Sequence, residues 1–274
     1  MATYVIGDIQ GCHYSFLELL QKIKFNKDKD QLHFVGDLVN RGKNSKIFLD
    51  WCLANSSNID SVLGNHDLHF LSVFFGESEQ TKLDTLDETL SSKQVEKYVE
   101  WLLNRKLAYD IDKTLIVHAG ISPNWTIKKT KKIASKVNKS VKKNPNKFFK
   151  NMYGNFPLAW SNKLPSSSKK RMAVNIMTRM RMLRDDLSMD YDYKGAIDET
   201  LKNNTPAIQP WFDFKRKDAD HKIITGHWSA IGVHQHQYGI SIDSGCAWGK
   251  FLSAIRLSDS KIFQVQANKQ DLIA

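Results

Sequence analysis

The sequence lacks the features that mark secreted, membrane-spanning and disulfide-stabilised proteins. Its 274 residues include only three cysteines, Cys12, Cys52 and Cys246, which lie far apart and form no C-x-x-C pair. That spacing fits a reducing compartment better than a disulfide framework. No apolar run is long enough to cross a bilayer, and the first residues form no basic-then-apolar signal. We therefore expect a cytoplasmic protein with no membrane partner.

Several functional motifs are also missing. The chain has no glycine-rich Walker loop, no H-E-x-x-H zinc motif and no recognisable nucleic-acid-binding motif. Acidic residues are absent from Lys128 to Lys150, where lysines are frequent, and the whole chain has a net charge of +11. The lysine run can be a solvated helical face, a positive rim that concentrates a polyanionic substrate, or a surface for a nucleic-acid backbone.

One pattern recurs five times along the chain. A short apolar run is followed by glycine next to a side chain that can bind a metal; the runs are residues 4–6, 32–35, 61–63, 115–117 and 223–225. In α/β proteins the loops beyond the carboxyl ends of strands are where sites assemble. We therefore expect six side chains from distant parts of the chain to form one cluster of oxygen and nitrogen ligands: Asp8, Gln10, Asp37, Asn65, His118 and His227.

This donor set indicates metal-dependent phosphoryl chemistry. Carboxylate, amide and imidazole ligands suit divalent Mn, Co, Fe, Zn or Mg better than a metal that prefers thiolates. Two ions roughly 3.5–4 Å apart that share a carboxylate can generate a hydroxide nucleophile for attack at phosphorus. Asp37 is the natural bridge because it lies centrally in the series. Arg41 can bind a phosphate oxygen, and His66, next to Asn65, can protonate a leaving oxygen.

Hydrophobic periodicity predicts the fold class. Helices are expected over residues 13–25, near 45–53 after a Ser45 cap, and over 81–107, with strands at 239–243 and 251–257. The opening order of strand, helix, strand, helix, strand predicts an α/β fold with parallel pairing. Since the ligands span residues 8 to 227, we expect one domain, 1–274, with a helical, basic, lid-like insertion at about 122–215.

The motifs together resemble a known family. G-D-x-x-G at Gly7, G-D-x-x-x-R-G at Gly36, G-N-H-D at Gly64, H-A-G at His118 and G-H at Gly226 are similar to those of the calcineurin-like metallophosphoesterases. Within them the chain most resembles the bacterial symmetrical diadenosine tetraphosphatases. The segments that carry this narrower resemblance are residues 4–12, 63–69, 178–181, 226–228 and 243–249.

The resemblance implies a four-layer α/β sandwich of two mixed sheets flanked by helices. It implies one metal held by Asp8, Gln10 and Asp37, and a second held by Asp37, Asn65, His118 and His227. The implied reaction is cleavage of diadenosine tetraphosphate into two ADP, and dinucleoside polyphosphate caps on RNA are further implied substrates. No obligatory protein partner is evident.

Several positions leave alternatives open. Asn40 stands where phosphoprotein phosphatases usually carry an aspartate that pairs with the catalytic histidine, so we hypothesise that it favours an anhydride substrate. Arg179 and Arg181 are candidate phosphate-binding residues, with a structural salt bridge as the alternative. The alternative functions are a Ser/Thr phosphoprotein phosphatase or other phosphoesterase, and a nucleic-acid-binding protein with a vestigial metal site. Four aromatic side chains can stack on adenine or belong to the core: Tyr153, Trp160, Trp228 and Trp248.

Overall fold

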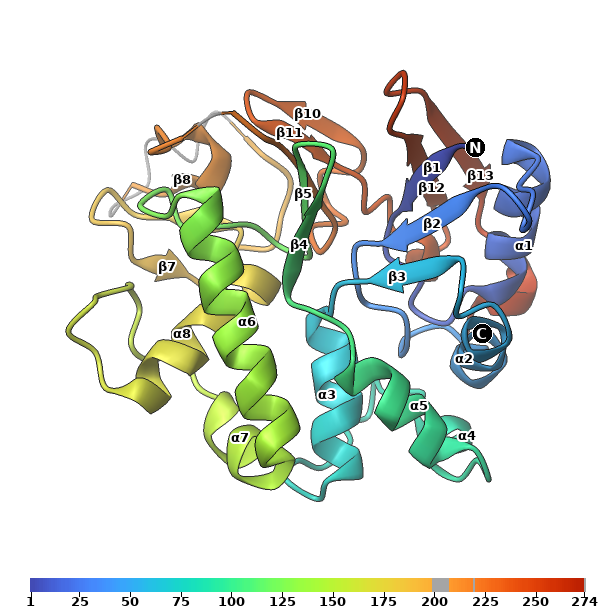
Figure 1. The fold of residues 1–274 in the computed structure, drawn as a ribbon, viewed down its shortest axis with the longest axis horizontal. Coiled ribbons are helices and arrows are strands. Elements are labelled where there is room, and N and C mark those ends of the chain that lie inside the picture. The colour runs from blue at the N-terminus through green and yellow to red at the C-terminus, as the bar shows by residue number, and fades with distance from the viewer. Residues whose placement is uncertain (199–206, 219, 274) are drawn as a thin grey trace.

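Two five-stranded mixed sheets lie face to face in the computed structural model, which describes residues 1–198, 207–218 and 220–273 (Figure 1). The first sheet has the order β13-β12-β1-β2-β3 and the second the order β10-β11-β9-β5-β4. Strands β1, β2 and β3 are parallel to one another, as are β11, β9 and β5, and the remaining pairings in these two sheets are antiparallel. The α/β sandwich predicted from the sequence is therefore confirmed.

The strands of the first sheet are β1 (Thr3–Ile6), β2 (Gln31–Phe34), β3 (Ile59–Ser61), β12 (Phe251–Arg256) and β13 (Ile262–Gln266). Those of the second are β4 (Ala108–Ile111), β5 (Thr114–Val117), β9 (Lys222–Thr225), β10 (His234–His236) and β11 (Gly239–Ser241). A small third sheet contains β6 (Met182–Leu183), β7 (Met189–Asp190) and β8 (Gln209–Pro210).

Successive side chains along a strand point to opposite faces of its sheet and therefore belong to different layers of the core. Val5 of β1 packs between the sheets in a core with Ile116 of β5 and Ile224 of β9. Its neighbours Tyr4 and Ile6 belong instead to the larger core beneath the helices. Both faces of β1 and β5 are covered, and these two strands are apolar except for their first residue, as expected for buried strands.

Helices cover the outer faces of the sandwich. α1 (His13–Ile23) contacts β12 and β13 and packs beside α2 (Ser45–Ala54). α3 (Asn65–Phe74), α4 (Asp87–Leu90) and α5 (Val95–Leu103) follow β3, and α6 (Ile127–Lys143) packs on β4. α7 (Pro145–Met152) and α8 (Ser166–Arg179) pack against α6, so the inserted region between β5 and β9 begins with three helices (Figure 1). Among the described residues no helix is both long and apolar enough to cross a membrane.

Two local predictions were wrong. The continuous helix expected over residues 81–107 is broken, and only α4 and α5 are helical there. Asp84 accepts a hydrogen bond from the backbone N–H of Thr81 at 2.6 Å, and this local bond stabilises a turn in place of a helix. Ser45 does not cap α2 from the N-cap position. It is the first residue of the helix, and its hydroxyl accepts a hydrogen bond from the backbone N–H of Asn40 at 2.9 Å.

Candidate active site

The carboxyl ends of four strands, two from each sheet, bring the predicted ligands together. Asp8 follows β1, Asp37 follows β2, His118 follows β5 and His227 follows β9. Ligand atoms of Asp8, Asp37 and His118 all lie within 4.8 Å of one another, and the three residues are buried. Residues separated by more than a hundred positions therefore form one cluster, as the repeated pattern predicted.

His118 Nε2 lies between Asn65 and Asp37. The ring nitrogen Nδ1 of His118 lies 2.8 Å from the carbonyl oxygen of Val35, so this nitrogen carries the proton and donates. The other nitrogen, Nε2, faces Asn65 Oδ1 at 3.3 Å and Asp37 Oδ2 at 3.4 Å. Burial opposes a charge on His118, but the Asp37 carboxylate outweighs burial and raises the pKa. Lone pairs of Asn65 Oδ1, His118 Nε2 and Asp37 Oδ2 lie close together. Only a proton or a metal cation between these atoms can satisfy all three.

Asp37 is the most connected carboxylate of the cluster. Burial alone would raise its pKa, but His118 and His66 outweigh that effect and lower it to about 2. Its Oδ1 accepts a hydrogen bond from the backbone N–H of His66 at 2.8 Å, and the Nε2 amide group of Gln10 donates to its Oδ2 at 3.4 Å. Gln10 therefore lies beside the carboxylate with which it was predicted to share a metal.

His227 gives the most direct support for a metal site. Its backbone N–H donates to both carboxylate oxygens of Asp8, at 3.2 and 3.1 Å, which fixes the two residues against each other. Burial and the nearby Arg181 lower the pKa of His227 well below its usual value, so the ring is neutral. Its Nε2 is buried and has no hydrogen-bond partner among the described residues. A buried, unpaired nitrogen beside carboxylates fits a divalent cation.

Glycine is needed where the backbone passes these carboxylates. A Cβ added to Gly226 would lie 1.9 Å from Asp8 Oδ1, and one added to Gly64 would lie 2.1 Å from Asp37 Oδ1. Non-glycine residues also take left-handed backbone conformations here, with φ of +50° at Asp37 and +68° at His227. Such backbone strain concentrates at functional sites.

We expect Gly226→Ala to displace Asp8. The variant should lose about 1–3 kcal/mol of unfolding free energy from overpacking, and its affinity for Mn²⁺ should fall at least about tenfold, as 1.4 kcal/mol corresponds to a factor of ten. Urea denaturation and titration calorimetry measure the two effects. Gly76→Ala is the control, because Gly76 has a φ of +73° but nothing within 4 Å of an added Cβ. Equal Mn²⁺ affinity in both variants would contradict this account of Asp8.

His66 is held by Asn40. The Asn40 carbonyl oxygen accepts hydrogen bonds from the backbone N–H groups of Arg41 (2.8 Å) and Thr85 (3.1 Å), which fixes the orientation of the amide. Its Nδ2 group must then donate, to Asp84 Oδ1 at 2.7 Å and to His66 Nδ1 at 3.1 Å. His66 Nδ1 is therefore an acceptor and the ring proton is on Nε2, 3.9 Å from Asp37 Oδ2. Burial lowers the pKa of His66, which favours this neutral form.

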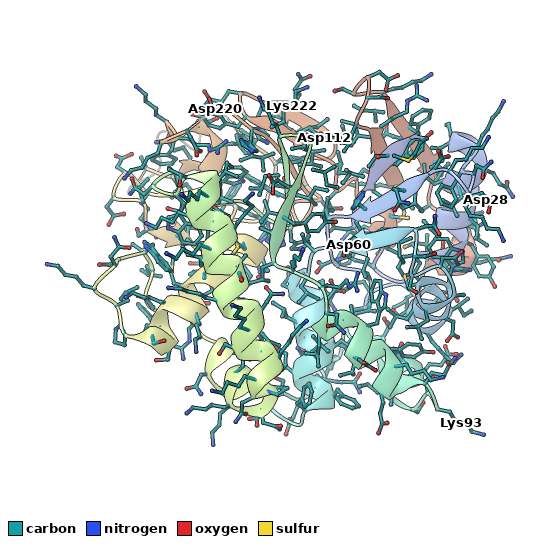
Figure 2. The ribbon with its side chains drawn as sticks, in the orientation of Figure 1. Asp28, Asp60, Lys93, Asp112, Asp220 and Lys222 are labelled. Carbon is teal, nitrogen blue, oxygen red and sulfur yellow. The ribbon has the colours of Figure 1, made fainter. Side chains whose placement is uncertain are left out.

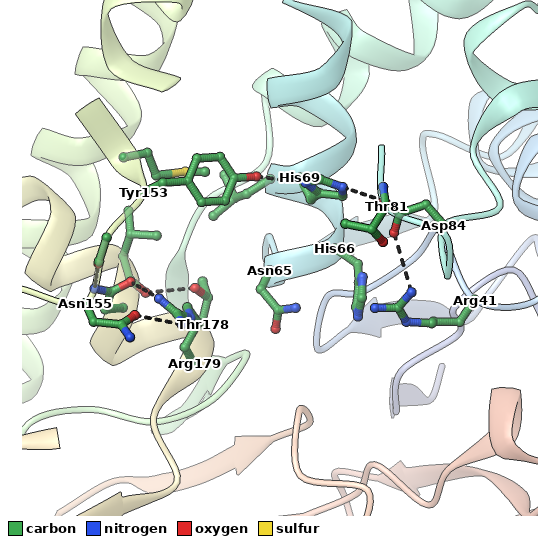
Figure 3. A pocket seen from close by; sticks show the side chains of 15 residues that line it. Arg41, Asn65, His66, His69, Thr81, Asp84, Tyr153, Asn155, Thr178 and Arg179 are labelled. Carbon is green, nitrogen blue, oxygen red and sulfur yellow. Dashed lines mark hydrogen bonds and ion pairs between the residues drawn. The ribbon is translucent and has the colours of Figure 1, made fainter. Parts of the chain in front are cut away.

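Arg41 and Arg179 each have a guanidinium held by neighbouring acceptors. Arg41 NH1 donates to the carbonyl of Leu83 at 2.7 Å and lies 3.4 Å from Asp84 Oδ1. Arg179 donates to Asn175 at 3.2 Å and to Asn155 at 3.1 Å (Figure 3). No salt bridge to a carboxylate forms at Arg179 within the described part of the chain.

Arg181 is a partly buried arginine next to His227. Its NH2 donates to the backbone carbonyl of His227 at 3.1 Å, and its Nε has no partner among the described residues. Burial lowers the pKa of Arg181 to about 10, so the guanidinium stays charged at neutral pH. The side chain thus adds a buried positive charge beside the cluster.

A central cavity of about 440 Å³ opens above these residues. It contains every predicted site residue except Asp8 and His118, which lie beneath it. Trp228 and Trp248 also line it, but Trp228 is buried with 3% exposure whereas Trp248 is 58% exposed. Of these two aromatic candidates, Trp248 is the one whose ring is open to a ligand. Trp160 packs edge-on against the buried Trp125 and lines neither this cavity nor the one described below.

Three buried or partly buried aspartates at the site were not predicted as site residues. Asp67 accepts hydrogen bonds from the backbone N–H groups of Asp37, Leu38 and Gly64 at 2.8–2.9 Å, and so shapes the loop that carries Asp37. Asp243 lines the central cavity, and burial raises its pKa to about 6. Asp67 and Asp243 both lie in motifs that carry the family resemblance, so the sequence offered a reason to count them as site residues. Asp84 lies in no such motif.

Comparison with known proteins places the chain in a family. The model of the calcineurin-like phosphoesterases matches residues 1–170. A Methylobacillus flagellatus protein named bis(5'-nucleosyl)-tetraphosphatase, symmetrical, is 40% identical, and the alignment covers 99% of this chain and 97% of that protein. A Neisseria meningitidis protein with the same name is also 40% identical, with 97% of this chain and 96% of that protein covered.

Solved structures share the fold at low sequence identity. One crystal structure, provisionally described as a diadenosine tetraphosphatase, has a TM-score of 0.66 and 20% identity and covers 98% of this chain and 94% of that chain. A serine/threonine phosphatase from Saccharomyces cerevisiae has a TM-score of 0.56 and 15% identity, with 98% of this chain and 80% of that chain covered. These likenesses support the two-sheet architecture.

Proposed function

The chain belongs to the calcineurin-like phosphoesterases and, within them, to the symmetrical bis(5'-nucleosyl)-tetraphosphatases, and we propose that it hydrolyses P1,P4-bis(5'-adenosyl) tetraphosphate to two ADP. The observation that carries the proposal is the buried cluster of Asp8, Asp37 and His118, of which Asp37 lines one cavity together with the donors His66 and Arg41. Attack at phosphorus needs both halves of this arrangement, a cation site and donors for the phosphate oxygens.

We propose that the cluster holds two divalent ions, Mn or Co first and Mg, Fe or Zn as alternatives. Asp8, Gln10 and Asp37 would hold one, and Asp37, Asn65, His118 and His227 the other. Ions bound there would lower the pKa of a water and neutralise phosphate charge. The neutral amide of Gln10 is a weaker donor than a carboxylate, which suits an exchangeable first ion.

The other groups act on the phosphates directly. Arg41, Arg179 and Arg181 supply fixed guanidinium groups that can bind non-bridging oxygens. His66 presents its Nε2–H toward the cluster, where it can donate to the bridging oxygen as the bond to phosphorus breaks. The leaving group is a nucleoside diphosphate, which departs more easily than a serine alkoxide and needs less help from an acid. The neutral tautomer set by Asn40 is therefore adequate for an anhydride.

Product analysis tests the proposed reaction. Metal-stripped protein is given diadenosine tetraphosphate with and without Mn²⁺, and the nucleotides are separated by anion-exchange chromatography. ADP as sole product, formed only with metal, is expected. ATP plus AMP would mean that a different phosphate is attacked, and turnover of a phosphopeptide alone would favour a phosphoprotein phosphatase.

We expect Asn40→Asp to affect stability and specificity together. The new carboxylate oxygen would face Asp84 Oδ1 at about the present 2.7 Å, and repulsion between the two should lower the unfolding free energy by about 1–3 kcal/mol. A carboxylate beside His66 Nδ1 also favours the imidazolium, a stronger acid. The ratio of kcat/KM for a phosphoserine peptide to that for diadenosine tetraphosphate should therefore rise about tenfold.

The double variant N40D/D84N is the control, since it restores a donor opposite the new carboxylate. It should regain most of the lost unfolding free energy, measured in urea, while keeping the shifted substrate ratio. An unchanged ratio, or wild-type turnover of the phosphopeptide that equals turnover of the dinucleotide, would refute the assigned role of Asn40.

We also propose dinucleoside polyphosphate caps on RNA as substrates. The chain has no Asp or Glu from Lys113 to Arg184, and nine lysines on α6 and α7 are exposed: Lys128, Lys131, Lys132, Lys136, Lys139, Lys142, Lys143, Lys147 and Lys150. These two helices pack against α8, whose last residue is Arg179. Such a surface suits an RNA backbone in continuous contact with the enzyme.

We expect a stronger salt dependence for capped RNA than for the free dinucleotide. Replacing Lys132, Lys136 and Lys139 by glutamine should reduce the slope of log kcat/KM against log salt by about 2 for capped RNA only, since each single-strand phosphate contact contributes about 0.7. The matched control replaces the exposed Lys27, Lys29 and Lys93, of which Lys93 projects from the rim beside α5 (Figure 2). Equal slopes in the two triple variants would show that the lysines of α6 do not bind the RNA backbone.

A further inference from the structure

A side cavity of about 380 Å³ lies next to the central cavity, between α3, α7 and α8 (Figure 3). Its volume falls within the roughly 300–1,000 Å³ of small-molecule sites. Four residues line both cavities: Arg41, Asn65, His66 and Arg179. The two spaces therefore meet at a shared wall that contains the group expected to assist the leaving oxygen.

The shared wall contains donors and no carboxylate. Two guanidinium groups, one amide and one imidazole N–H line it, whereas Asp37 and Asp243 line the central cavity alone. Asp84, the carboxylate of the side cavity, has its oxygens occupied by Asn40, His69 and Thr81. A polyphosphate chain can cross this wall without meeting a free negative charge.

The direction in which the leaving nucleotide departs points to the side cavity as its binding site. In phosphoryl transfer the attacking and leaving oxygens lie roughly in line. The predicted ligands Gln10, Asp37 and His227 line the central cavity only, so attack comes from that side. His66 stands at the shared wall, and a nucleotide that leaves past its Nε2–H enters the side cavity.

The far side of this cavity suits a nucleoside. Leu68, Met152 and Val174 form a buried apolar surface, and the ring of Tyr153 is 44% exposed at the rim. The Tyr153 hydroxyl lies 2.8 Å from His69 Nδ1, and His69 Nε2 lies 2.8 Å from Asp84 Oδ2, which fixes the ring (Figure 3). An exposed aromatic ring held in one orientation is a platform for base stacking.

Arg179 is placed between the apolar surface and the centre. Asn175 and Asn155 hold its guanidinium from one side, and its Cζ lies 4.6 Å from the centre of the Tyr191 ring. A nucleoside against Tyr153 would therefore have its phosphates beside Arg179 and Arg41. The base would lie farthest from the predicted metal cluster and the phosphates nearest to it.

We propose that the side cavity binds the nucleoside of the departing nucleotide, with the base stacked on Tyr153 and its diphosphate between Arg179 and Arg41. This assignment rests on the proposed function and adds to it a binding site for one of the two nucleosides. Because a two-armed substrate fills two cavities that meet at the scissile bond, the arrangement also accounts for cleavage at the central bridge.

Steady-state kinetics of three variants test this assignment. Tyr153→Ala removes the ring, Tyr153→Phe keeps the ring and removes the hydroxyl, and Phe251→Ala removes a ring of matched 45% exposure on β12 that lines neither cavity. KM and kcat for diadenosine tetraphosphate are measured at fixed free Mn²⁺. The inhibition constant of inorganic tetraphosphate, which has the four phosphates but no nucleoside, is measured for the same proteins.

Loss of one stacked base should raise KM of Tyr153→Ala at least about tenfold, with kcat and the tetraphosphate inhibition constant changed less than about threefold. Tyr153→Phe keeps the ring but loses its hydrogen bond to His69, so it should raise KM clearly less than Tyr153→Ala does, and Phe251→Ala should stay within about threefold of the wild type. The assignment is overturned if Tyr153→Ala leaves KM unchanged, if tetraphosphate inhibition weakens as much as KM rises, or if Tyr153→Phe loses as much as Tyr153→Ala. A wild-type protein that forms no ADP overturns the proposed function and this assignment together.

Discussion

Replacing Asp37 by asparagine should lower kcat for diadenosine tetraphosphate by about a thousandfold or more. Asp37 lies close to two imidazole rings of the site, with His118 Nε2 at 3.4 Å and His66 Nε2 at 3.9 Å from its Oδ2. The amide keeps the size of the side chain but removes the charge that two cations would share. The expected defect is therefore in metal binding and in catalysis together.

Two measurements separate that defect from misfolding. Mn²⁺ should raise the melting temperature of the wild type, because it binds only the folded state, and should raise that of Asp37→Asn much less. Asp30→Asn is the matched control: Asp30 is also buried and accepts hydrogen bonds from the backbone N–H groups of Ala2 and Asn26. It should lose about 1–3 kcal/mol of stability and keep its response to Mn²⁺. Full activity in Asp37→Asn would refute the metal site.

His66→Asn should lower kcat by about 10²–10⁴-fold, the usual contribution of a positioned proton donor. The cluster of Asp8, Asp37 and His118 remains, so the Mn²⁺-induced rise in melting temperature should be close to that of the wild type. Stopped-flow measurement of ADP formation gives the rate of the chemical step. The loss should shrink for a substrate with a more acidic leaving group, which needs the donor less.

The control for this variant is His33→Asn. His33 is a partly buried histidine in strand β2 whose Nδ1 lies 3.0 Å from the Tyr109 hydroxyl, and it lines neither of the two cavities. Its replacement should change stability but not kcat. If His66→Asn lost Mn²⁺ binding to the same degree as activity, His66 would be a supporting residue of the metal site and not a donor to substrate.

The sequence was sufficient to predict that Asp8, Asp37 and His118 lie together, because each of them follows its own strand. An apolar run fixes the strand, and glycine at its end lets the backbone pass a carboxylate, as Gly226 does beside Asp8. Parallel pairing then places these strand ends on one edge of the sandwich. Each step depends on a few consecutive residues, and such local patterns can be read without a structure.

The surroundings of the cluster depend on tertiary contacts and could not be predicted in the same way. Asp84 was placed within a helix, yet its loop brings it to Asn40, Arg41 and His69, and only the folded chain reveals this. Trp228 was a candidate for base stacking, but packing against Phe212 buries it. Tyr153 was an equal candidate from the sequence, and its exposure beside α3 distinguishes it from the buried Trp228.

Hydrolysis of diadenosine tetraphosphate in ¹⁸O-labelled water, followed by mass spectrometry of the nucleotides, tests the central claim most directly. Water attack at the phosphorus next to the central bridge breaks that phosphorus–oxygen bond, and the bridging oxygen leaves with the other half. The account predicts ADP as the only nucleotide, with one ¹⁸O in the terminal phosphate of half the molecules. ATP and AMP as products, with the label in either, would contradict cleavage at the centre of the substrate.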